Sequence, residues 1–202
     1  MSFTHLHVHS QFSILDGATR IKDMIAKAKA DNMPAVALTD HGNMFGVKAF
    51  YDECKKQGFK GIIGCEAYVA RRTRFDKTEQ IDRSGEHLVI LAKNREGYHN
   101  LIKLTSAAWV DGFYYRPRID KEILEKYHEG IIALSACLAG EIPRAILNGD
   151  IDKARETALW YKNLFGEDYY IEIQDHGLKD GFPSHGRSHD VSEVRLGGPD
   201  SC

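Results

Sequence analysis

The chain has 202 residues, of which 43% are hydrophobic and 28% charged, and its formal net charge is −2. This ordinary composition excludes collagen-like, coiled-coil and disordered classes, and no stretch approaches the ~20 apolar residues that a membrane span needs. The first residues show no basic segment followed by an apolar one, so we expect no secretory signal and a soluble, cytoplasmic protein. The near-neutral charge also argues against a protein that coats nucleic acid without specificity.

Short apolar runs alternate with amphipathic helical patterns from the N-terminus to residue 175. The runs predict strands at residues 4–9, 35–39, 61–65, 88–92, 131–134 and 169–173. Helices are predicted between them, at residues 21–30, 47–56, 98–109, 121–127, 142–147 and 151–165. The charged stretch 71–85, after the third strand, is expected to be an exposed connection.

This alternation indicates an α/β fold in which helices cover a parallel sheet. The repeated unit favours a barrel over an open doubly wound sheet. Because a complete eight-stranded barrel takes about 250 residues, the six strands expected here predict a barrel that is incomplete at its C-terminus. We therefore expect one domain over residues 1–180. Residues 181–202 have no helical or strand period and predict a tail that is either disordered or non-native.

Two histidines lie at the end of the first predicted strand, in the sequence HLHVH. Because residues two apart on a strand point to the same side, His7 and His9 can face one metal ion. The alternative is that the two histidines are buried in the core, with their hydrogen bonds satisfied there. Asp16 follows in a turn, where a single acid is more typical of a turn or a helix N-terminus than of a metal site.

Polar side chains also follow the later predicted strands. Asp40 and His41 come after AVALT, Glu66 after the third strand, and Cys137 after the fifth. Because catalytic groups collect at the carboxyl ends of parallel strands, these residues are expected to share a site. A cysteine there is usually a small hydrophobe, but beside histidine and glutamate it also fits a thiolate ligand. His87 opens the fourth strand instead, so pattern alone favours an exposed or capping histidine on the opposite face.

Ligands from several strand ends indicate more than one metal ion, and no Ser-His-Asp or glycine-rich phosphate motif competes. Clustered divalent ions suit phosphoester hydrolysis, since they activate water and stabilise the attacking and leaving oxygens. The mixture of nitrogen, oxygen and sulfur donors favours zinc, with manganese or iron as alternatives. The four cysteines form no CxxC pair, which predicts free thiols or ligands rather than a disulfide framework.

Six long segments carry a family resemblance. They are HLHVHSQFSILDG (5–17), MPAVALTDHGNMFG (33–46), KGIIGCEAYVA (60–70), HLVILAKNREGYHNLIKL (87–104), EGIIALSACLAGEIP (129–143) and YIEIQDHGL (170–178). They resemble the PHP (polymerase and histidinol phosphatase) family, in the form found at the N-termini of bacterial replicative DNA polymerases of the C family. The resemblance runs from Phe3 to the region of Lys179 and implies a distorted seven-stranded (β/α) barrel with a multinuclear metal site.

The resemblance implies a specific set of ligands, which hold two to three divalent ions. These ligands fall on His7, His9, Asp16, His41, Glu66, His87 and Cys137, so His87 is included despite its place in the strand. Catalytic roles are expected for Asp40, His41 and Glu66, with Asp40 orienting a ligand from behind. The family completes its site with a Thr-Asn-Asp-x-His-Tyr segment that is absent here, and His189 and Asp190 stand in the wrong order to replace it.

Three functions are consistent with this resemblance. In the first, the chain is the PHP domain of a replicative polymerase that synthesises DNA with Mg²⁺, and the domain is a 3′–5′ exonuclease. Its partners would be DNA and the proofreading and sliding-clamp subunits, with no membrane. In the second, the chain is a stand-alone phosphatase for a small phosphate monoester. In the third, it is an inactive structural module, and the chain by itself is expected to be inactive.

Arginines after the third strand are candidates for contact with DNA. Arg71, Arg72 and Arg74 lie in the connection that follows this strand, and their guanidinium groups suit a phosphate backbone. A solvated loop is the alternative for these three residues. Arg116 and Arg118 are further candidates on the same grounds.

Overall fold

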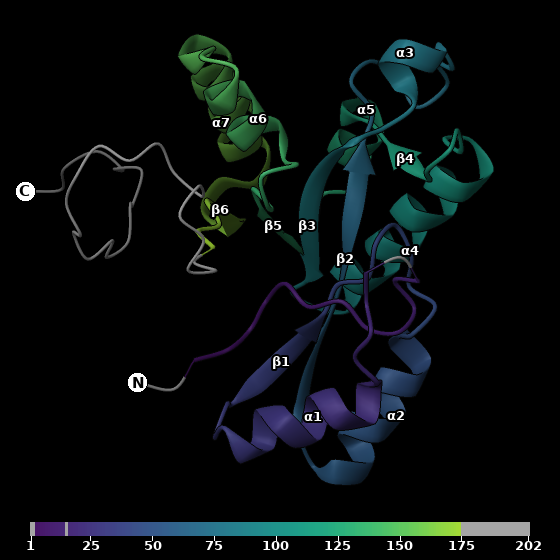
Figure 1. Cartoon of the computed structure of the whole chain (residues 1–202), viewed down its shortest axis with the longest axis vertical. Helices are drawn as coiled ribbons and strands as arrows, with labels where there is room; N and C mark the ends of the chain where they lie inside the picture. Colours follow the sequence, from purple (N-terminus) through teal and green to yellow (C-terminus); the bar gives the residue numbers. More distant parts are fainter. Residues whose placement is uncertain (1–2, 15, 175–202) are drawn as a thin grey trace, which may run out of the picture.

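The computed structural model describes residues 3–14 and 16–174 (Figure 1). The predicted tail at 181–202, with His189 and Asp190, and the boundary expected at residue 180 therefore lie outside the described residues. Within the described ranges, no helix combines the length and apolar character needed to cross a membrane.

Helices and strands alternate along the chain, as the periodicity predicts. The strands are β1 (Ala35–Leu38), β2 (Lys60–Val69), β3 (Glu86–Ala92), β4 (Arg118–Ile119), β5 (Ile131–Leu134) and β6 (Tyr169–Tyr170). The helices are α1 (Ile21–Ala30), α2 (Val47–Gln57), α3 (Glu79–Asp82), α4 (Arg95–Val110), α5 (Lys121–Lys126), α6 (Glu141–Leu147) and α7 (Ile151–Phe165). A 3-10 turn at Gly166–Asp168 joins α7 to β6.

The strands form one sheet in the order β1-β2-β3-β5-β6, with β4 beside β2. The β1–β2, β2–β4 and β5–β6 pairs are parallel, but β3 is antiparallel to both β2 and β5. The expectation of a parallel sheet is therefore wrong at β3. The predicted α/β class is confirmed, in a distorted form of the expected barrel whose strands, over the described residues, run from β1 to β6 without closing.

The segment 4–9 lies beside β1 but is not the regular strand that we predicted. The Ala37 amide donates to the His5 carbonyl and the Thr39 amide to the Val8 carbonyl, both at 2.9 Å. Two steps along β1 therefore match three steps along the segment, so one extra residue interrupts the ladder, as in a bulge. The segment is fixed against β1 nonetheless, because Val8 also donates its amide to the Thr39 hydroxyl at 2.8 Å.

The helices pack on the sheet through the faces that their periodicity predicts. The first helix, α1, buries Ile21, Met24, Ile25 and Ala28. With α2 it forms a core cluster on β1 that includes the fully buried Leu38 and Phe50. A larger cluster joins β2, β3 and β5 to α4 and α7. In Figure 1, α1 and α2 lie beside β1, and α4 lies on the other side of β2 from α7.

Strand boundaries differ from the prediction where pairing is decided by distant residues. The strand predicted at 61–65 continues to Val69, because residues 64–69 pair with β3 and the end of the strand also pairs with β4. The strand predicted at 169–173 is reduced to Tyr169–Tyr170. Neither α3 nor β4 was predicted, since both are short and have no period of their own.

The segment 71–85 is more ordered than the exposed connection that we predicted. It contains α3 and the buried side chains of Arg74 and Asp82. A fully buried arginine, Arg118, donates to the carbonyl oxygens of Arg74, Asp76, Asp82 and Gly112. The suggestion that Arg118 contacts DNA is therefore wrong, because its guanidinium group is enclosed by protein backbone.

Candidate metal centre

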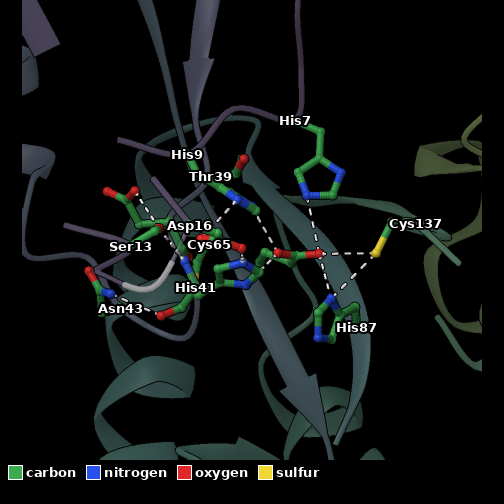
Figure 2. Close-up of polar contacts among 12 residues, drawn as sticks. His7, His9, Ser13, Asp16, Thr39, His41, Asn43, Cys65, His87 and Cys137 are labelled. Carbon is green, nitrogen blue, oxygen red and sulfur yellow. Dashed lines mark hydrogen bonds and ion pairs between the residues drawn. The ribbon is translucent and has the colours of Figure 1, made fainter. Parts of the chain in front are cut away.

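A single buried carboxylate, that of Glu66 on β2, lies at the centre of a cluster of imidazoles. One of its oxygens, Oε1, is 3.2 Å from His7 Nε2 and 2.8 Å from His87 Nδ1. The other, Oε2, is 2.9 Å from His9 Nε2 and 2.6 Å from His41 Nδ1. Figure 2 shows these four rings, from three parts of the chain, turned toward one another.

The sheet explains how residues so far apart in sequence meet. His41 lies three residues after β1, and its backbone continues the parallel pairing with β2, where the Glu66 amide donates to the Asp40 carbonyl at 3.1 Å. His87 is the second residue of β3, and because β3 is antiparallel to β2, its first residues pair with the end of β2, close to Glu66. The geometric objection to His87 was therefore wrong, because it assumed that every strand runs in the same direction.

Asp16 and Cys137 extend the cluster on opposite sides. The Nε2 of His41 donates to Asp16 Oδ2 at 2.8 Å, and Asp16 Oδ1 is 3.9 Å from His9 Nδ1. The Cys137 sulfur, after β5, is 3.5 Å from His87 Nδ1 and 3.7 Å from Glu66 Oε1. The structure thus brings together all seven of the residues expected to be ligands.

Three groups within the cluster have donor atoms close enough to hold a metal ion: His7-His9-Glu66, His9-Asp16-His41 and His41-Glu66-His87. The buried atoms fit such a role. Among the described residues, His7 Nε2, His9 Nε2, His41 Nδ1 and Glu66 Oε2 have no partner with hydrogen-bond geometry, although each of the three nitrogens lies within 3.2 Å of a Glu66 oxygen. Unpaired imidazole and carboxylate lone pairs aimed at a shared volume are the arrangement that a divalent cation requires.

The electrostatics of the cluster also favour a cation. Burial alone would lower the pKa of His7, but the carboxylates of Glu172 and Glu66 outweigh it and raise the value to about 9. The pKa of His41 is raised against burial by Glu66 and Asp16. Burial opposes ionisation of Glu66, yet the surrounding histidines hold its pKa well below the usual range. The Glu66 carboxylate is thus ionised and attracts positive charge, which either protons or metal ions supply.

Asp40 lies behind the cluster and contacts none of the imidazoles among the described residues. Its buried carboxylate accepts from the Ser10 amide at 2.6 Å, the Ser10 hydroxyl at 2.9 Å and the Ser13 hydroxyl at 2.8 Å. The Ser13 hydroxyl also accepts from the His41 amide at 3.1 Å. Asp40 therefore anchors the loop that leads to Asp16. A catalytic role for Asp40 stays a prediction.

Sequence reasoning missed one acidic residue, Glu172, which follows β6. Its Oε1 lies 2.7 Å from His7 Nδ1, and its amide donates to the Ser135 hydroxyl at 2.9 Å. An imidazole that donates from Nδ1 to a carboxylate presents its Nε2 lone pair to a metal. The signal was available, since Glu172 stands at a strand end like the other acids of the cluster.

We expect Glu172→Gln to weaken metal binding by about 10- to 100-fold, because losing the carboxylate frees the His7 ring and makes it less basic. Titration calorimetry with Zn²⁺ or Mn²⁺ measures the effect. The matched control is Glu167→Gln, which changes an exposed side chain that pairs only with Lys162 among the described residues. Equal affinities for Glu172→Gln and the wild type would show that Glu172 does not orient His7.

The three arginines proposed to contact DNA are each bound to an acid. Arg71 donates to Glu86 at 2.8 Å and the buried Arg74 to Asp120 at 2.9 Å. Arg72 pairs with Asp82 and lowers the pKa of Asp82 to about 2, although burial opposes ionisation of this carboxyl group. The three guanidinium groups therefore already have carboxylate partners. Phosphate contact by Arg71, Arg72 and Arg74 stays a prediction.

Comparisons with known proteins agree with this geometry. The family profile described as "PHP domain" matches residues 5–176. The DNA polymerase III subunit alpha of Borreliella burgdorferi is 55% identical over 88% of this chain, and that of Treponema pallidum is 52% identical over 88%. The chain spans only 16% and 15% of the lengths of these relatives.

Among solved structures, an amidohydrolase from Chromobacterium violaceum superposes with a TM-score of 0.40 at 15% identity, covering 83% of this chain and 84% of that one. A likeness this weak does not identify a shared fold. The family is shown by the sequence match, which includes every one of the seven clustered residues. The chain therefore belongs to the PHP domain family.

Proposed function

We propose that the chain is the phosphoesterase module of a DNA polymerase III alpha subunit, and that its centre removes nucleotides from the 3′ end of a DNA strand. The observation that carries the proposal is the convergence of imidazoles and carboxylates into three adjacent groups of metal-ligand geometry. The likeness to polymerase alpha subunits supplies the substrate class. Because the chain spans a small part of these relatives, DNA synthesis and contacts with other replicase subunits are proposed for the parent protein.

The residues that would hold the ions are the three groups around Glu66, with Cys137 completing the group that contains His87. The chemistry supplied by bound divalent ions is activation of water and stabilisation of charge on phosphoryl oxygens. The donor set favours Zn²⁺, with Mn²⁺ or Fe²⁺ as alternatives.

The chain's own residues fix the geometry in which this chemistry takes place. Asp16, whose side chain is 55% exposed, lies on the open side of the cluster and holds the His41 ring through its Nε2. The Tyr68 ring closes another side, with its centroid 6.0 Å from that of His41 and 5.1 Å from that of His87. The substrate phosphate would therefore enter on the side of Asp16, where a reacting diester is positioned next to buried, preorganised ligands.

The test is a nuclease assay on the full-length polymerase that contains this sequence, with 3′-labelled single-stranded DNA and added Zn²⁺ or Mn²⁺. We expect His9→Ala to reduce digestion by at least about 100-fold, because His9 belongs to two of the three groups. The control is His99→Ala, which removes an exposed histidine of α4 outside the cluster.

Two results would contradict the proposal. Equal digestion by the wild type and His9→Ala would show that the centre does not perform the reaction. Faster hydrolysis of p-nitrophenyl phosphate than of DNA, lost in His9→Ala, would instead favour the phosphatase. Primer extension by the same preparations reports whether each polymerase is folded.

A further inference from the structure

Three large aromatic side chains form an exposed row beside the metal centre. Phe45 lies between β1 and α2, Trp109 near the end of α4, and Phe113 just after that helix. The Trp109 ring centroid is 5.5 Å from that of Phe45 and 5.4 Å from that of Phe113, to which it is nearly parallel. The three residues, here called the aromatic row, are 63%, 42% and 46% exposed, in the order Phe45, Trp109, Phe113. Contiguous exposed rings of this kind mark a binding surface more often than a core.

The aromatic row is fixed relative to the metal centre by a hydrogen bond. The indole Nε1 of Trp109 donates to the carbonyl oxygen of Gly42, at 2.8 Å, and Gly42 is the residue after His41. Gly42 itself has φ +60°, and a Cβ there would come within 2.7 Å of Pro117 and 3.0 Å of Tyr68. The loop that carries His41 therefore packs closely against the same part of the chain that carries the aromatic row.

An unpaired cation lies beside Tyr68, whose ring borders the metal centre. Arg116 is exposed, and its guanidinium carbon is 5.7 Å from the centroid of Tyr68, the ring that borders His41 and His87. No carboxylate of the described residues pairs with Arg116, in contrast to Arg71, Arg72 and Arg74. Its backbone is held in a tight turn, since the Tyr114 amide donates to the Arg116 carbonyl at 3.0 Å.

This combination matches the chemistry of a single nucleic-acid strand. Ring faces stack on unpaired bases of any sequence, and a nearby guanidinium binds the phosphate that links them. In a duplex the base faces are already stacked and cannot reach exposed rings. An apolar peptide would use the rings but gain nothing from a free cation beside a centre rich in histidines and acids.

We propose that the aromatic row and Arg116 bind the single-stranded end of a DNA substrate. Bases would stack on the rings of Phe45, Trp109 and Phe113, one phosphate would contact Arg116, and the terminal phosphodiester would lie at the metal centre. The inference rests on the proposed function, which it extends from the reaction to the recognition of the strand.

The test is the binding of fluorescein-labelled oligothymidine to the full chain, followed by fluorescence anisotropy in EDTA so that no hydrolysis occurs. We expect Phe45→Ala and Phe113→Ala each to weaken binding about tenfold. Arg116→Gln is expected to weaken it and to reduce the slope of log affinity against log salt by about 0.7. The matched controls are Phe75→Ala and Arg155→Gln, which change exposed side chains on the segment 71–85 and on α7 and should bind as the wild type does.

An abasic oligonucleotide of the same length separates stacking from charge. The wild type should bind it about tenfold more weakly than oligothymidine, and Phe113→Ala should show a much smaller difference. Because Phe45 and Phe113 make no side-chain hydrogen bond, their variants carry the test even if Trp109→Ala disturbs the fold, and thermal melting verifies each variant.

The outcomes separate this inference from the proposed function. Row variants that bind DNA as tightly as the wild type, or a wild type indifferent to abasic sites, would overturn the inference even if the polymerase digests DNA. Base-dependent binding lost in the row variants supports the inference, whether or not the centre proves to be a nuclease. Binding of an apolar peptide in preference to oligothymidine would assign the aromatic row to a protein partner and overturn it.

Discussion

Replacing Glu66 with glutamine is expected to remove two of the three candidate ion positions and to leave the third. Glu66 belongs to His7-His9-Glu66 and to His41-Glu66-His87, but not to His9-Asp16-His41. The amide keeps the shape of the side chain and removes the charge, so the change acts on ion binding more than on packing. A structural zinc with four ligands is stabilised by about 10–16 kcal/mol, which corresponds to roughly 3 kcal/mol for each ligand. The dissociation constant at the two affected positions should therefore rise by about 100-fold or more.

Elemental analysis after dialysis against Zn²⁺ or Mn²⁺ measures the number of ions that each protein holds. The complementary variant, Asp16→Asn, should affect only the position formed by His9, Asp16 and His41. Thermal melting gives a second measure, because ions that bind the folded state raise its melting temperature. That increase should be much smaller in Glu66→Gln than in the wild type. Identical ion content in both proteins would show that the carboxylate is not a ligand.

The residues of this centre differ in how easily the sequence reveals them. His41, Glu66 and Cys137 each follow a short apolar run, so their place at the edge of the sheet depends only on local pattern. His87 could not be placed in this way, because its position depends on β3 running antiparallel to β2, and strand direction is a property of the whole chain. The family resemblance supplied what the pattern did not.

The buried charges show a second limit of sequence reasoning. In the sequence, Arg118 looks like its neighbour Arg116, and both are equally polar. Arg118 is fully enclosed and donates to backbone carbonyls, whereas Arg116 is exposed and has no acidic partner among the described residues. Three of the four backbone carbonyls that accept from Arg118 belong to the segment 71–85, more than thirty positions earlier in the chain. No local period encodes such a contact.

Replacing Arg118 with methionine is expected to lower the free energy of unfolding by about 3–5 kcal/mol, because several buried carbonyl oxygens lose a charged hydrogen-bond donor. The guanidinium group is 0% exposed and satisfies four carbonyl oxygens, those of Arg74, Asp76, Asp82 and Gly112. Methionine fills much of the volume but donates no hydrogen bond. The carbonyl oxygens of Arg74, Asp76 and Asp82 then lose the donor that Arg118 supplies, at about 1–3 kcal/mol each before relaxation admits water, while the Gly112 carbonyl keeps its backbone bond to the amide of residue 118.

Urea unfolding of the full chain measures this loss, which is a large share of the roughly 5–15 kcal/mol typical of a domain. Arg118→Lys should recover only part of it, because an ammonium group has three donors on one atom and cannot span the separate carbonyls that the planar guanidinium reaches. The control, Arg155→Met, changes an exposed residue of α7 and should stay within about 0.5 kcal/mol of the wild type. Equal stability of Arg118→Met and the control would mean that water replaces the lost donors at no cost.

The same substitution connects the stability of the fold to the recognition of the strand. The Nε of Arg118 donates to the Gly112 carbonyl at 3.1 Å, and so ties down the turn that carries Phe113 and Arg116. If this turn positions the aromatic row, Arg118→Met should weaken oligothymidine binding. The measurement is made without urea, at a temperature where the variant is still folded. The seven clustered residues, Glu66 among them, lie on other segments and should keep their ion content. Loss of DNA binding with retained ions would show that the turn after α4 serves recognition and that the metal centre forms independently of it.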